Sequence, residues 1–176
     1  MTRTHMTHKR PFETRRYLLK VLAALPLLVV TAAAAQETLF DAAWPNTDFS
    51  RLAIDLGEVI SGGPPRDGIP AILDPSFIGA SEETWLDDRE PVMTYVPDDG
   101  PARAYPIRYL MWHEIVNDVV DGEPITVTFC PLCNTGMVFE GRLGGRTLTF
   151  GVSGLLRHSD MIMYTRPRPT SGRQGL

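Results

Sequence analysis

Both cysteines of the 176-residue chain lie in one short segment, Cys130-Pro131-Leu132-Cys133. Two thiols at this spacing can close a local disulfide, bind one metal ion or exchange with another disulfide. Thioredoxin-type exchange places the first cysteine at the N-terminus of a helix, where the dipole stabilises a thiolate. Glycines at positions 136, 141, 144 and 145 follow Cys133 and predict a hairpin instead of that helix. Thiol chemistry therefore stays possible, but on a turn between strands.

A C-P-x-C turn between strands is similar to the metal-binding knuckles of zinc ribbons and rubredoxins, whose sites have four ligands. The chain has no second cysteine pair, so the candidates that could complete the site are His113, His158 and Asp160. Cys130, Cys133 and His113 with an open fourth position would suit zinc or copper. The leading hypothesis is a metal-binding or redox-active module centred on Cys130 and Cys133. The alternative is a noncatalytic structural or ligand-binding domain in which these cysteines form a local disulfide, with His113 only forming hydrogen bonds.

Other polar residues form no recognisable catalytic set. Glu82-Glu83 and Asp87-Asp88 predict a solvated face, and Asp67 beside Gly68 predicts a loop. Ser153 lacks the surroundings of a nucleophile elbow, and Gly62-Gly63-Pro64 lacks the lysine and helix of a phosphate-binding loop. No catalytic residue, substrate or cofactor-binding residue is assigned, and whether the chain is an enzyme stays open.

The first 35 residues have the three zones of an export signal. A basic zone ends at Lys20, the apolar stretch Val21–Val30 follows, and Ala33-Ala34-Ala35 predicts cleavage before Gln36. The apolar run of about 15 residues is shorter than the ~20 that a spanning helix needs, which disfavours a retained anchor. Thr14-Arg15-Arg16-Tyr17-Leu18-Leu19-Lys20 resembles the twin-arginine signature, with general secretion as the alternative. We therefore expect a periplasmic or secreted protein.

The charge of the remaining chain restricts its partners. Residues 1–35 carry six of the 17 basic residues and one of the 21 acidic residues, so the remaining 141 residues have a formal net charge of −9. An acidic surface repels nucleic-acid phosphates and anionic lipid headgroups. We expect no nucleic-acid partner and no membrane span after cleavage, whereas a small-molecule or protein partner is not specified.

The elements that position these residues are short. Strands are predicted around residues 58–60, 71–73, 91–96, 125–129 and 160–164, with a helix over 108–116 that ends near Asn117. Ser81–Asp88 carries a helix-start signal. Gly144-Gly145 predicts a hairpin that joins 137–142 to 146–152, with Met137 and Phe139 on one face with Phe150. Gly/Pro-rich loops separate the elements, and the expected class is β-rich α+β with one or two short helices.

Four motifs occur in order along the chain: Asp67-Gly-Ile-Pro-Ala71, Trp112-His-Glu-Ile-Val-Asn-Asp118, Phe129-Cys-Pro-Leu-Cys-Asn-Thr-Gly136 and Ser153-Gly-Leu-Leu-Arg-His-Ser-Asp160. With them the chain resembles the family called domain of unknown function 3179, over about Val59 to Tyr164. The resemblance implies an exported prokaryotic protein and no assigned activity.

The end of the chain departs from that family pattern. After Tyr164 the chain continues with a segment that contains three arginines and no acid, instead of an acidic residue and a tryptophan-containing stretch. We expect a signal peptide at 1–35, one globular domain at 36–165 that is C-terminally truncated, and an aberrant basic tail at 166–176. A natural flexible tail is the alternative.

Overall fold

The computed structural model of the chain describes residues 43–166. The predicted signal peptide and residues 167–176 of the predicted tail lie outside these residues. The chain consists of two compact units, and the boundary between them lies between Leu56 and Gly57. The described part of the first unit contains the 3-10 helix η1 (Phe49–Arg51), whose N-terminal cap is Asp48. The Asp48 carboxylate accepts the Ser50 amide at 3.1 Å, as an N-cap should.

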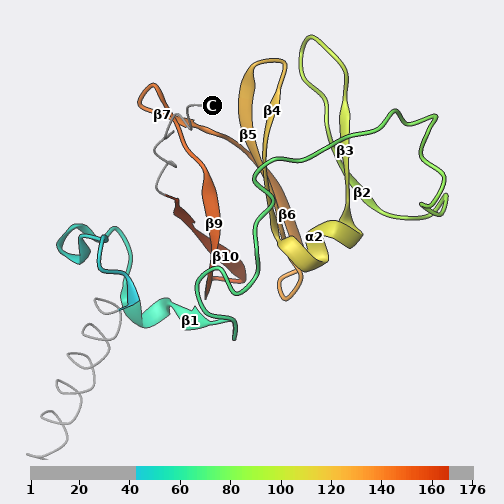
Figure 1. Cartoon of the computed structure of the whole chain (residues 1–176). Coiled ribbons are helices and arrows are strands. Elements are labelled where there is room, and N and C mark those ends of the chain that lie inside the picture. Colours follow the sequence, from blue (N-terminus) through green and yellow to red (C-terminus); the bar gives the residue numbers. More distant parts are fainter. Residues whose placement is uncertain (1–42, 167–176) are drawn as a thin grey trace, which may run out of the picture. The chain divides into compact units, whose positions relative to one another are not determined.

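Strands dominate the described chain from Leu56 onward, which confirms the predicted β-rich α+β class (Figure 1). The elements in chain order are η2 (Leu56–Glu58), β1 (Ile60–Ser61), β2 (Val92–Tyr95), β3 (Arg103–Pro106), α2 (Ile107–His113), β4 (Ile115–Val120), β5 (Glu123–Cys130), β6 (Thr135–Glu140), β7 (Arg142–Leu143), β8 (Arg146–Thr147), β9 (Phe150–Arg157) and β10 (Asp160–Thr165).

The central sheet has the order β4-β5-β6, with both pairs antiparallel. One face of this sheet packs against β3 and α2. Successive strand residues point to opposite faces, so Ile125, Val127 and Phe129 of β5 share that face. They form the hydrophobic core with the following buried side chains: Tyr105, Leu110, Val116 and Val120.

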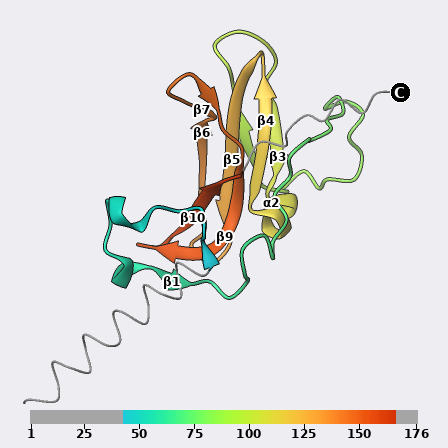
Figure 2. The ribbon, with the colours of Figure 1, turned by 60° about the vertical axis from the view of Figure 1, so that its left-hand side comes forward.

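The opposite face of β5 is also buried. Thr126, Thr128 and Cys130 point to this face, and none is more than 3 % exposed. β9 passes beside the central sheet (Figure 1 and Figure 2) and pairs with β1 and β10 in a second antiparallel sheet. The alternating residues of β5 are typical of a strand with one solvated face, whereas here both faces are buried.

The predicted helix over 108–116 is correct at its start and wrong at its end. α2 ends at His113, and Glu114 adopts a left-handed backbone with φ 57°. The following Ile115-Val116 are β-branched, lose rotamer freedom in a helix and pair well in a sheet. They therefore begin β4, in which Ile115 pairs with Thr128 and Val116 with Val127 of β5.

The hairpin at Gly144-Gly145 exists, but it is much shorter than predicted. Only the two-residue strands β7 and β8 flank this turn. β6 pairs with β5 and β9 pairs with β10, so Met137 and Phe139 share no hairpin with Phe150. β6 and β9 pair with the longer strands β5 and β10 and not with each other. A sheet of three or more strands is more stable than an isolated two-stranded hairpin.

Two of the predicted strands are shorter in the structure, and one predicted helix is absent from the described residues. The strand at 58–60 becomes β1 at 60–61, and the strand at 71–73 becomes a single bridge between Ile72 and Val116. Residues 81–88 form turns instead of a helix. The Glu83 carboxylate accepts the amides of Trp85 and Leu86 at 2.6 and 2.8 Å, and these bonds favour a turn over a helical ladder.

Within residues 43–166 no helix is long and apolar enough to cross a membrane.

Candidate functional site

The two cysteines lie on the turn that joins β5 to β6. Cys130 is the last residue of β5 and pairs with Thr135, the first residue of β6. The Cys133 amide donates to the Cys130 carbonyl at 3.2 Å, and Pro131 occupies the second turn position, where its fixed φ fits. Asn134 closes the loop with φ 50°, a conformation that asparagine tolerates. The predicted turn between strands is therefore present.

The two sulfur atoms are in contact. Cys130 donates its thiol hydrogen to Cys133 Sγ, and the two Sγ atoms are 2.7 Å apart. Both residues are free thiols, with Cys130 buried and Cys133 half-buried. Leu132, between them, is 71 % exposed at the tip of the turn. The arrangement pairs one protected thiol with one that solvent can reach.

The protonation of Cys130 follows from its surroundings. Burial raises the pKa of the Cys130 thiol to about 12, and its hydrogen bond to Cys133 and the charge of Glu114 act in the same direction. A buried thiol resists ionisation because a low-dielectric surrounding disfavours the charged form. Cys130 therefore keeps its proton at neutral pH and serves as a donor to Cys133.

Glu114 is the acidic residue whose charge contributes to the raised pKa of Cys130. It lies between α2 and β4, its amide donates to Leu110 O, and its carbonyl accepts the Phe129 amide, both at 2.8 Å. Phe129 directly precedes Cys130 in β5. Burial raises the pKa of the Glu114 carboxyl. The sequence does not mark Glu114 as a site residue, because its pattern predicts a helix that continues through this position.

The two histidines that the sequence suggested as metal ligands are engaged elsewhere. His113 donates from Nδ1 to the Pro70 carbonyl at 2.7 Å. His158 Nε2 lies 3.6 Å from the Glu58 carboxylate, which also pairs with Arg157. Asp160 accepts the amide of its neighbour Met161.

The structure therefore brings together Cys130 and Cys133 but does not add the histidines to them. Over residues 43–166 no three His, Cys, Asp or Glu side chains are grouped so that they could hold a metal ion. The residues present do not fit the three- or four-ligand zinc site that the sequence suggested.

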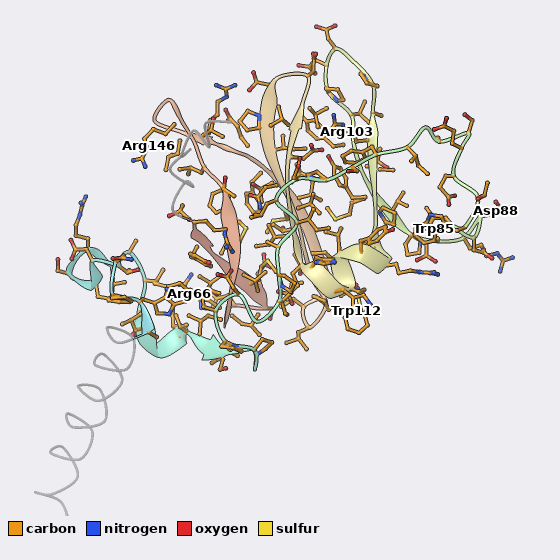
Figure 3. All side chains as sticks on the ribbon, viewed as in Figure 1. Arg66, Trp85, Asp88, Arg103, Trp112 and Arg146 are labelled. Carbon is orange, nitrogen blue, oxygen red and sulfur yellow. The ribbon has the colours of Figure 1, made fainter. Side chains whose placement is uncertain are left out.

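A second polar cluster lies where β3 faces β4, with Arg103 at its centre (Figure 3). Arg103 Nη1 contacts both oxygens of Asp118 at 2.5 and 2.6 Å, and Tyr105 donates its hydroxyl to Asp118 at 2.7 Å. The guanidinium also lies 4.5 Å above the Phe77 ring. Burial and the Asp118 hydrogen bond raise the pKa of Tyr105, so the phenol stays protonated.

This cluster lines a cavity of about 370 Å³. Its wall comes from the loop at Leu73–Phe77, from β3, β4 and β5, and from residues 147–149. Asp118 has little capacity left for a ligand, because it already accepts from Arg103, Tyr105 and the Val119 amide. The cavity has room for a small molecule. The buried Asp118 carboxylate, however, is used to hold β3 to β4 through Arg103 and Tyr105. Neither Arg103 nor Asp118 was selected from the sequence, where a lone Arg and Asp 15 positions apart give no signal.

Asp67, the loop aspartate of the first motif, is held by hydrogen bonds to other parts of the domain. Its backbone is left-handed with φ 56°, and its amide donates to Val152 O at 2.9 Å. Its carboxylate accepts the Tyr164 hydroxyl and Arg166 Nη1. Arg166 is the first residue of the predicted aberrant tail, and here it holds the loop to the end of β10. These contacts agree with the loop that Asp67 and Gly68 predict.

The chain belongs to the family described as "Protein of unknown function (DUF3179)", whose match covers residues 66–174. The match includes the thiol turn, Glu114 and the Asp118 cluster, and it confirms the resemblance found from the sequence motifs. No curated protein and no solved structure shows a significant match to the chain.

Proposed function

We propose that this DUF3179 domain is a thiol–disulfide redox module whose reacting groups are Cys130 and Cys133. One observation carries the proposal: two free thiols with Sγ atoms 2.7 Å apart, one buried and one half-buried, on a hairpin turn. A disulfide has an S–S length of about 2.05 Å, so closing the bond requires only a small movement of the sulfurs. The ladder of β5 and β6 keeps the two thiols at this spacing.

The unequal exposure of the two thiols suggests an order of events. Cys133 is the more accessible thiol, and its sulfur is in contact with that of Cys130. Cys133 attacks a disulfide of the partner, a mixed disulfide forms, and the partner's other sulfur leaves as a thiolate. Cys130 then loses its proton and attacks Cys133 Sγ, which releases the partner's first sulfur. The partner disulfide is thereby reduced and the Cys130–Cys133 pair is oxidised; the reverse sequence donates a disulfide.

A redox titration tests this proposal. Purified chain is equilibrated with glutathione buffers of graded potential, quenched with acid and weighed by mass spectrometry. We expect a cooperative loss of two hydrogens with a midpoint above about −300 mV, where labile and catalytic disulfides fall. The C130S variant should instead accumulate one glutathione on Cys133. A pair that never oxidises, or a disulfide with a midpoint far below −300 mV, would contradict redox function.

A noncatalytic ligand-binding domain is the second candidate, and the 370 Å³ cavity beside Arg103 favours it. In that case Cys130 and Cys133 close a permanent staple on the turn, and the titration gives a midpoint well below about −300 mV. A metal-binding role would rest on the two thiolates alone, a soft pair that suits Cu(I). Stoichiometric copper on the protein with both thiols in place would favour that role.

The proposal includes export of the protein from the cytoplasm. The basic, apolar and Ala33-Ala34-Ala35 zones support removal of residues 1–35, and Arg15-Arg16 support the twin-arginine route. An extracytoplasmic location would supply disulfides as redox partners, because oxidising compartments keep thiols paired.

A further inference from the structure

Arg103 uses only part of its guanidinium for the pair with Asp118. Both Asp118 oxygens contact Nη1, at 2.5 and 2.6 Å, and no described residue accepts a hydrogen bond from Nε or Nη2. Over residues 43–166 no side-chain nitrogen or oxygen is buried without a hydrogen-bond partner, so these two nitrogens are open to solvent. They form the planar fork that binds a carboxylate through two parallel hydrogen bonds. Arg103 therefore brings an unused anion-binding edge to the cavity that it lines.

Asp74 lines the same cavity and carries an unmatched charge. Ile72 is fixed to the edge of β4 by backbone hydrogen bonds of 2.8 and 2.9 Å, and Asp74 follows two residues later. Within the described part of the chain the Asp74 carboxylate has no hydrogen-bond or ion-pair partner, whereas Asp118 is matched by Arg103. The two carboxylates and one guanidinium that line the cavity therefore leave it one negative charge, that of Asp74.

The edge of β4 adds a second acceptor. The Phe129 amide bonds the Glu114 carbonyl, so the backbone groups of residues 115, 117 and 119 point away from β5 in this antiparallel pair. The Asn117 amide is bonded to Ile72, but among residues 43–166 the Asn117 carbonyl has no partner. This carbonyl therefore lies free on the strand edge that borders the cavity.

The cavity also has an apolar wall that is open to solvent. Leu73 is 48 % exposed, Phe77 41 % and Val119 54 %. Removing such surface from water is favourable. The volume of about 370 Å³ is at the lower end of the range for ligand pockets, about 300–1,000 Å³. A fitting ligand is therefore small, with one carboxylate, one cationic group and an apolar part.

We propose that this cavity binds a small aliphatic α-amino acid. The ligand carboxylate accepts from Nε and Nη2 of Arg103, the ammonium group donates to Asp74 and to the Asn117 carbonyl, and the side chain packs on the apolar wall. A ligand with only a carboxylate would be repelled by Asp74, and a simple amine would leave the Arg103 fork unused. Neither cysteine lines the cavity, so the inference does not rest on the redox function; it gives a ligand class to the ligand-binding candidate.

Isothermal titration calorimetry of the full chain with L-leucine and L-valine tests this proposal. Two analogues of L-leucine serve for comparison: isocaproate lacks the ammonium group, and isoamylamine lacks the carboxylate. The variants are D74N, which removes the unmatched charge, and R103K, which keeps a cation beside Asp118 but removes the fork. The control is D88N, because Asp88 is an exposed aspartate on the same loop and lies far from Arg103 (Figure 3). Thermal melting checks that each variant is folded.

We expect both amino acids to bind at one site per chain, and the two analogues to bind at least about tenfold more weakly than L-leucine. D74N and R103K should each weaken binding about tenfold or more, as expected for the loss of hydrogen bonds to a charged group. D88N should match the wild type. If R103K does not fold, D74N decides, because the Asp74 carboxylate makes no hydrogen bond or ion pair in the described chain.

Three results would overturn the proposal: no binding by the wild type, binding that D74N leaves unchanged, or isocaproate that binds as tightly as L-leucine. The redox titration of Cys130 and Cys133 is a separate measurement, so the failure of one proposal is distinguishable from the failure of the other.

Discussion

The carboxamide of Asn117 bonds both backbone groups of Phe150. Asn117 Oδ1 accepts the Phe150 amide at 2.8 Å, and Nδ2 donates to the Phe150 carbonyl at 2.9 Å. Asn117 lies on β4 and Phe150 begins β9. The Asn117 side chain therefore bonds the backbone of a strand in the other sheet, much as a neighbouring strand would. Buried backbone groups need partners, and here a side chain supplies them.

Replacing Asn117 by alanine should destabilise the domain by about 1–3 kcal/mol, because two part-buried backbone groups of Phe150 lose their partners. Urea denaturation measures the change as a shift of the midpoint. The exposed N46A variant is the control and should stay within about 0.5 kcal/mol of the wild type. A midpoint for N117A equal to that of N46A would contradict the bridging role.

Removing Asp118 should cost more than removing an exposed acid. D118A leaves Arg103 and the Tyr105 hydroxyl without their partner, and breaking a buried pair costs about 3–5 kcal/mol. The control E123A breaks the exposed pair with Arg142, in which Glu123 is 60 % exposed, and should cost about 0–1 kcal/mol. Thermal melting of both variants compares them. Similar melting temperatures would show that the Asp118 cluster does not brace β3 against β4.

The two thiols should differ strongly in reactivity. Burial raises the pKa of Cys130 and shields its sulfur, whereas Cys133 is half-exposed. Short treatment of the reduced protein with iodoacetamide should label Cys133 at least about tenfold faster than Cys130. Peptide mass spectrometry counts the label at each site. Labelling of Cys130 at an equal or higher rate would reverse the order of attack proposed above.

The stability difference between wild type and E114Q should depend on pH. Because burial raises the folded-state pKa of Glu114, its contribution to stability is fully present below the unfolded-state value, about 4.3, and is lost as pH rises through the folded-state value. E114Q has no such ionisation, so it should gain stability relative to wild type as the pH rises from 4 to 7. Urea titrations at several pH values measure the difference. A difference that stays constant with pH would show that the Glu114 carboxyl titrates alike in the folded and unfolded states.

Replacing Arg15 and Arg16 together by lysine should block export if the twin-arginine route is used. Cell fractionation in a bacterial host with that route should show the variant in the cytoplasm with residues 1–35 attached. The control R3K/R10K keeps the arginine pair and should be exported, with Gln36 as the new N-terminus. Normal export of the R15K/R16K variant would leave the general secretory route.

Several features of the domain follow from local sequence chemistry. Proline after Cys130 and the glycine-rich stretch after Cys133 favour a turn followed by a strand, and the structure has β6 there. Alternating β-branched residues mark β5, which extends by two residues at its start and one at its end beyond the predicted 125–129. These features depend on neighbours along the chain, so the sequence determines them without reference to the rest of the fold.

Contacts between distant segments decide the rest. Ile115 and Val116 fit a helical pattern, but in the structure they pair with β5, so α2 ends before them and the Glu114 carbonyl accepts the Phe129 amide. The sequence does not reveal this pairing, because it joins segments that are distant along the chain. Likewise, Asn117 of β4 bonds Phe150 of β9, which lies 33 positions later in the chain. The sequence by itself determined the thiol turn; the tertiary structure decided which side chains surround it, because strand pairing depends on the total surface that all segments bury together.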